Sequence, residues 1–179
     1  RGWNYSIIAH ELVSNPSVDP KELGILIIDG YTRYQAPNSP ATLSLIDMAA
    51  IPAVISSLDD FSRSLNDAYK NPEEKRIIEE ILTNSGEFGL QMYMSLETDE
   101  RIFISYTMDI ISFARDIGNA LPAMHPAADT LVQSVSDAVL YHTGLNRPYA
   151  TGLSIFSPVH KEVILEHIFE YSPAIAVSE

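Results

Sequence analysis

Ser154 is the residue whose surroundings most resemble those of a catalytic nucleophile, because it follows Gly152 in the run Gly-Leu-Ser-Ile-Phe. A nucleophile elbow needs a second Gly two residues after the Ser, so that a strained turn exposes the hydroxyl. Phe156 occupies that position, and the pattern therefore predicts that Ser154 lies in a buried strand. The eight glycines also form neither a GxGxxG nor a GxxxxGK phosphate-binding loop.

The five histidines do not have metal-ligand spacing. His160 and His167 fall on one predicted helix, about 10.5 Å apart along its axis, so one ion cannot bind both. His10 and His125 stand alone, which favours surface or capping roles. His142 is predicted to lie in the last turn of a helix before Gly144, where a protonated imidazole would be stabilised by the helix dipole.

Acidic residues occur in adjacent pairs, which invites a test for acid–base chemistry. The pairs lack the apolar surroundings that raise a carboxyl pKa, so they are interpreted as solvated faces, with a calcium site as the less favoured alternative. No EF-hand pattern is present. From the residues alone, no catalytic or metal-binding set is predicted. The pairs are Asp59-Asp60, Glu73-Glu74, Glu79-Glu80 and Asp99-Glu100.

Composition excludes several classes of function. Lys and Arg total 11 against 24 Asp and Glu, and the net charge of -13 repels nucleic-acid phosphates. No apolar run reaches the roughly 18 residues of a membrane span. The absence of Cys removes disulfides, thiolate zinc sites and any cysteine nucleophile. An acidic chain without Cys suits an extracellular or cell-surface protein, although many cytosolic proteins share this composition.

The elements that must position these residues are read from periodicity, caps and breakers. The strongest helix start is Asp19-Pro20-Lys21-Glu22, with an N-cap, Pro at the first position and an acid in the first turn. Helices are predicted over residues 5–13, 20–36, 54–69, 71–82, 108–117, 126–142 and 159–171. Strands are predicted over 42–46, 90–96 and 151–156.

Strands separated by helices favour an α/β protein, and the 179 residues are predicted to form one unit. Only the strands at 42–46 and 151–156 are convincing, and both are nearly continuous apolar runs. We therefore expect them to be buried strands whose neighbours lie partly outside this chain. The start at Arg1 has two interpretations: a leader has been removed, or the chain is a piece of a longer protein.

The order of landmarks along the chain resembles the clostripain family of cysteine peptidases. Each motif is weak alone, but the ordered set covers nearly the whole chain. The motifs are Gly2-Trp3-Asn4-Tyr5, Pro20-Lys21-Glu22-Leu23 leading to Ile28-Asp29-Gly30-Tyr31, Thr42 to Asp47, Leu58-Asp59-Asp60-Phe61, Met108 to Ala114, and Gly152 to Pro158.

The resemblance implies part of a caspase–hemoglobinase-like α/β sandwich with a helical C-terminal subdomain, and endopeptidase activity, usually after Arg or Lys. In that family the catalytic His and Cys precede the Gly-Trp pair. This chain begins there and has no Cys, so it corresponds to the part after the nucleophile and has no catalytic residue of its own. Calcium is a further possibility that the resemblance implies. The alternative is a non-catalytic, family-derived binding or scaffold domain.

The resemblance also places substrate-binding residues at Gly2, Trp3, Asn4 and Tyr5, as a wall of the parent enzyme's pocket. The structural alternative is that Trp3 packs against the first helix. Arg1 stands where many members have an Asp that binds the basic side chain of the substrate. The implied partners are a protein or peptide substrate and the N-terminal catalytic portion of the same protein.

Overall fold

The computed structural model describes residues 5–33, 42–84, 87–94, 101–144, 147 and 149–156. Six helices and one short 3-10 helix alternate along the chain with five strands in these residues. The helices are α1 (Tyr5–Ser14), α2 (Pro20–Arg33), α3 (Ile51–Ala68), α4 (Pro72–Asn84), α5 (Ile110–Ala120), η1 (Pro122–Met124) and α6 (His125–Ala138). The strands are β1 (Thr42–Ile46), β2 (Glu87–Met94), β3 (Arg101–Asp109), β4 (Val139–Gly144) and β5 (Ser154–Phe156).

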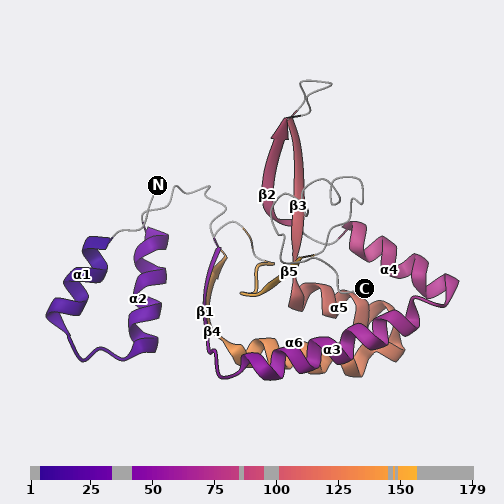
Figure 1. Ribbon diagram of the computed structural model, residues 1–179, viewed down its shortest axis with the longest axis horizontal. Coiled ribbons are helices and arrows are strands. Elements are labelled where there is room, and N and C mark those ends of the chain that lie inside the picture. The colour runs from indigo at the N-terminus through magenta and orange to yellow at the C-terminus, as the bar shows by residue number, and fades with distance from the viewer. Residues whose placement is uncertain are drawn as a thin grey trace, which may run out of the picture.

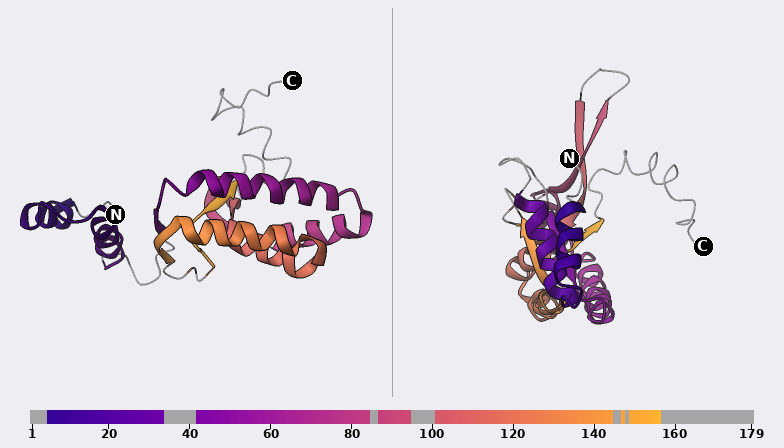
Figure 2. Two further views of the ribbon diagram at one scale, coloured as in Figure 1. Left: turned by 90° about the horizontal axis from the view of Figure 1, so that it is seen from below. Right: turned by 90° about the vertical axis from the view of Figure 1, so that its left-hand side faces the viewer.

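Helices and small sheets occupy separate parts of the molecule. Helices α3, α4, α5 and α6 form a layer below the strands, and the β2–β3 hairpin projects away from it (Figure 1). The α1–α2 pair lies at the far end, beside the β1–β4 ribbon. Figure 2 shows α3 and α6 running side by side in this layer. The alternation of helices and strands agrees with the predicted α/β class.

Both described sheets are small, and every strand pairing in them is antiparallel. β1 pairs with β4 in one sheet, and the order in the other is β2-β3-β5. Leu43 to Ile46 are half-buried rather than buried as predicted. One face of β1 is covered by α2. Gly24 of α2 approaches Leu45 so closely that a Cβ on Gly24 would come within 2.6 Å of the Leu45 side chain.

The hydrophobic core belongs to the helical layer. Phe61 on α3 and Phe113 on α5 pack edge to face with ring centroids 6.0 Å apart. Their neighbours Ile78, Ile117 and Val135 are also completely or almost completely buried. Because burial of each large apolar side chain contributes about 1.5–3 kcal/mol, this cluster holds the four helices together.

Local sequence signals explain the helix starts. The Asp19 carboxylate accepts hydrogen bonds from the backbone N–H groups of Lys21 at 2.8 Å and Glu22 at 3.4 Å, which confirms the predicted N-cap of α2. The helix predicted from residue 108 begins instead at Ile110. Asp109 ends β3 in an extended conformation and caps α5 through the Ser112 N–H.

The prediction that His142 ends a helix is wrong. α6 stops at Ala138, and residues 139–144 form β4, in which His142 pairs with Ser44 of β1. Val139 and Tyr141 favour strand, and the partner strand supplies the hydrogen bonds. Strand β3 was also not predicted. The predicted helix over 159–171, with His160 and His167, and the Asp99-Glu100 pair lie outside the described residues.

Candidate functional site

The predicted substrate-binding turn is described only at its last residue. Tyr5 is the first residue of α1, and its side chain is 72% exposed. Gly2, Trp3 and Asn4 lie outside the described residues. The pocket wall therefore stays a prediction.

The most enclosed polar cluster of the described residues lies where β3 runs into α5. Asp109 is only 3% exposed, and a buried carboxylate is costly unless hydrogen-bond donors surround it. Oδ1 accepts the backbone N–H of Ser112 at 2.9 Å, and Oδ2 accepts the backbone N–H of Thr151 at 2.7 Å. The Thr151 hydroxyl lies 2.8 Å from both oxygens. We call Asp109, Ser112 and Thr151 the Asp109 clamp.

The clamp continues into the segment that precedes β5. The N–H of Ile110 donates to the carbonyl of Leu153 at 3.1 Å, and the Ser44 hydroxyl donates to the carbonyl of Gly152 at 2.5 Å. Gly152 has φ +123°, and a Cβ there would approach Val139 to 2.8 Å. Both the backbone and the space therefore require Gly at this position. Together these contacts join β1, β3 and β5.

A cavity of about 60 Å³ remains beside the clamp, lined in part by Ser44, Asp109 and Ser154. This volume is about that of two liquid waters and is too small for a peptide side chain and its backbone. The Asp109 oxygens are already occupied by donors, and the Ser44 hydroxyl is bound to a carbonyl. The geometry indicates a structural junction rather than a general base.

Ser154 is exposed at the start of β5, so the prediction that it is buried is wrong. Ser154 is the first residue of this three-residue strand, opposite Asp109 at the end of β3, and Ser is mostly exposed in proteins. In the described part of the chain, Ser154 forms no hydrogen bond with a histidine, so nothing activates its hydroxyl. The conclusion that it is not a nucleophile is unchanged.

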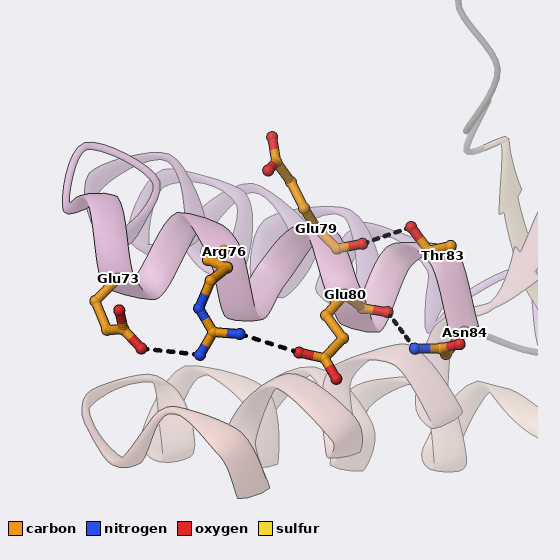
Figure 3. A network of polar contacts seen from close by, with 6 residues as sticks. All are labelled: Glu73, Arg76, Glu79, Glu80, Thr83 and Asn84. Carbon is orange, nitrogen blue, oxygen red and sulfur yellow. Dashed lines mark hydrogen bonds and ion pairs between the residues drawn. The ribbon is translucent and has the colours of Figure 1, made fainter.

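The acidic pairs on α3 and α4 are exposed or half-exposed, which confirms their interpretation as solvated faces. Arg76 bridges Glu73 at 2.9 Å and Glu80 at 3.4 Å in one row along α4 (Figure 3). Within the described ranges, no three acidic or histidine side chains converge to hold a metal ion. Calcium binding therefore stays a prediction.

Two histidines have their predicted surroundings. His10 is exposed on α1. His125 begins α6, with Nδ1 3.4 Å from the carbonyl of Gly118 and Nε2 3.5 Å from Asp129, and its side chain is largely exposed. These are the surface and capping roles that isolated histidines favour.

A second long-range polar contact fixes α2 to the β1–β4 ribbon. The Tyr141 hydroxyl donates to Oδ1 of Asp29 at 2.7 Å. This bond to a carboxylate, together with partial burial and the negative charge of Asp29, raises the pKa of Tyr141 above its ordinary value. The contact positions α2 but offers no catalytic group near neutral pH.

Comparison with known proteins shows to which family the chain belongs. The model of the clostripain family matches residues 1–169. The chain belongs to the clostripain family. No curated protein and no solved structure matches it. The expected resemblance is confirmed, and it supports a function related to cysteine peptidases and a protein substrate.

In this clostripain-family chain, sequence reasoning missed the Asp109 clamp. The N-cap role of Asp109 could have been predicted, because an Asp directly before an apolar helical segment is an N-cap signal. The contact with Thr151 could not be predicted, because 42 positions separate the partners.

For the described helices, no segment is long and apolar enough to cross a membrane.

Proposed function

We propose that this chain is the C-terminal part of a clostripain-like cysteine endopeptidase whose catalytic His and Cys lie in an N-terminal portion. The observation that carries the proposal is a family match over residues 1–169 in a chain without any Cys. Attack by a thiolate is the family's chemistry, and this chain has no thiol to supply. Alone, it is inactive.

The open edge of β1 supports a partner in the same protein. Among the described strands β1 pairs only with β4, so its second edge has no described neighbour. An unpaired edge strand is a template for strand addition. The half-buried run from Leu43 to Ile46 would become fully covered if strands of the catalytic portion continued this sheet, as in a caspase–hemoglobinase-like sandwich.

The alternative is a non-catalytic binding or scaffold domain derived from the family. The same observation favours it, because a family member that has lost its thiol keeps the fold without the chemistry. The two candidates differ in what is encoded upstream. A His-bearing strand and an Asp-Ala-Cys strand before Arg1 support the endopeptidase, and their absence supports the scaffold.

Reconstitution tests the proposal directly. The chain and the upstream portion are produced together and separately, and hydrolysis is measured on peptides with each possible residue before the cleaved bond. We expect turnover only from the combination, and none after the upstream Cys is changed to Ala. Turnover by this chain alone that Ser154→Ala abolishes would contradict the proposal.

We further propose that Gly2, Trp3, Asn4 and Tyr5 line the substrate pocket of the parent, that the parent acts outside the cell or on its surface, and that calcium supports it. A rigid aromatic side chain beside a Gly suits a slot for a side chain. In the reconstituted enzyme, Trp3→Ala should lower kcat/KM per folded molecule. A loss of stability with unchanged kinetics would make Trp3 structural.

A further inference from the structure

We infer that a groove between α4 and α5 binds an extended polypeptide segment that presents a Lys or Arg side chain next to an apolar residue. The groove has a volume of about 530 Å³, within the range of about 300–1,000 Å³ typical of ligand sites. Its lining shares no residue with the Asp109 clamp.

The floor of the groove is apolar and its walls are polar. Ile77 and Ile81 of α4 are half-buried, and the exposed Ala120 of α5 completes the apolar part of the lining. Ile77 and Ile81 pack against the edge of the main core. The floor offers apolar contact to the aliphatic stem of a long side chain and to an apolar neighbour.

The walls carry hydrogen-bond acceptors and two negative charges. Asp116 and Asn119 project from α5, and neither side chain forms a hydrogen bond or ion pair within the described ranges. On α4, Asn84 uses its amide N–H on the carbonyl of Glu80, which leaves its amide oxygen available. Among the described residues, no Lys or Arg is part of the lining.

Glu80 is the remaining wall residue, and its present partner is weakly held. Arg76 approaches Glu80 at 3.4 Å but Glu73 at 2.9 Å, and all three side chains are more than half exposed. Exposed pairs of this kind contribute little. Figure 3 shows Glu73, Arg76 and Glu80 in one row along α4, so Arg76 can keep its shorter contact with Glu73 when a ligand takes Glu80.

The acceptor-rich lining selects the chemistry of the ligand. An ammonium group has three donors and a guanidinium has five, and neither has an acceptor. An anion would meet two carboxylates, and the chain's net charge of -13 would repel it further. A metal ion is less suited, because the described residues bring no three acidic or histidine side chains together.

Binding is tested with the full 179-residue chain, whose four core helices carry their own buried cluster. The probe is fluorescein-labelled Gly-Leu-Lys-Leu-Gly, compared with the same peptide carrying acetyl-lysine. Anisotropy measures affinity, and amide chemical shifts locate the site. We expect saturable binding of the lysine peptide, shifts confined to α4 and α5, and loss of binding on acetylation.

Variants with matched controls assign the two carboxylates. Asp116→Asn and Glu80→Gln should each weaken binding by about threefold, as expected for an exposed charge pair. Asp59→Asn and Glu74→Gln remove the same charge from exposed or half-exposed positions outside the groove and should leave affinity unchanged. Thermal unfolding of all four variants confirms that each is folded.

Five outcomes would overturn the inference. If the control variants weaken binding equally, the acidic surface as a whole attracts the peptide and the groove does not bind it specifically. Unchanged affinity in both groove variants would show that the peptide does not bind at these carboxylates. Amide shifts outside α4 and α5 would show that it binds elsewhere. Saturation of the same amides by calcium chloride alone would make it a metal site. Concentration-dependent shifts of these amides without peptide would make it a contact between two copies of the chain.

Discussion

The helical layer and the N-terminal helix α1 differ in how completely they bury their apolar side chains. Phe61, Ile117 and Val135 of the layer are at most 1% exposed. In α1, by contrast, Leu12 is 42% and Val13 is 80% exposed, and no described residue of α1 is buried. The difference teaches that α3 to α6 form a finished core, whereas α1 and the open edge of β1 present surface suited to further covering.

Removing the central aromatic contact is the strongest test of this comparison. Phe61→Ala should destabilise the chain by about 3–5 kcal/mol, because it leaves a cavity against Phe113. Leu12→Ala, on the exposed helix, should change the free energy of unfolding by less than about 0.5 kcal/mol. Urea unfolding measures both. Similar losses in the two variants would show that α1 has a buried face and would end the distinction.

The Asp109 clamp should be the next largest contributor, because it ties the small sheets to the helical layer. Asp109→Ala removes the cap of α5 and leaves the half-buried N–H and hydroxyl of Thr151 without their acceptor, at a cost of about 2–3 kcal/mol. Asp59→Ala, at an exposed position, is the matched control.

An intermediate loss in Asp109→Asn would sharpen the interpretation, since the amide keeps one acceptor. A loss in Asp109→Ala no greater than in Asp59→Ala would make the clamp energetically unimportant.

The contact between Asp29 and Tyr141 tests how firmly the N-terminal pair is attached. Tyr141→Phe should cost about 1 kcal/mol. Because the folded-state pKa of Tyr141 is raised above its ordinary value of 10.0, the contribution of this bond is complete below that pH and is lost as pH rises through the folded-state pKa. Wild type should therefore lose more stability than Tyr141→Phe as the pH rises above about 10.

Parallel alkaline stability curves for the two proteins would contradict this expectation. They would indicate that α2 is held by packing on Leu45 rather than by the hydrogen bond.

The exposed row on α4 should have the smallest effect on stability. Arg76→Ala removes two contacts whose side chains are at least 64% exposed, and we expect a change below about 1 kcal/mol that disappears at high salt. Thermal unfolding at low and high salt measures it. A larger, salt-independent loss would show that the aliphatic part of Arg76 supports the helical layer.

Agreement between sequence and structure is best where the signals are local. The Asp19 cap, the stop of α1 near Asn15 and the apolar period of α3 need only neighbouring residues, and they place these helices within one to three residues at most ends. The chain order of motifs also sufficed to identify the clostripain family.

Disagreement is concentrated where a distant strand decides the outcome. Residues 139–144 continue the apolar pattern of α6, but they pair with β1, nearly one hundred residues earlier in the chain. The same applies to Ser154, whose exposure follows from which strands neighbour β5. Tertiary context overrides propensity in such segments, because ladder hydrogen bonds and the burial of one face outweigh small local preferences.

By itself, the sequence determined the helices α1 to α4, the acidic solvated faces on α3 and α4, the absence of a thiol nucleophile and the family. These follow from residue type and short-range spacing, which do not depend on the path of the chain. Only the tertiary structure decided that Asp109 is enclosed by Thr151, that Asp29 meets Tyr141, and that Glu80 and Asp116 face one groove. Such contacts join residues that are distant in sequence, and packing of the core selects them.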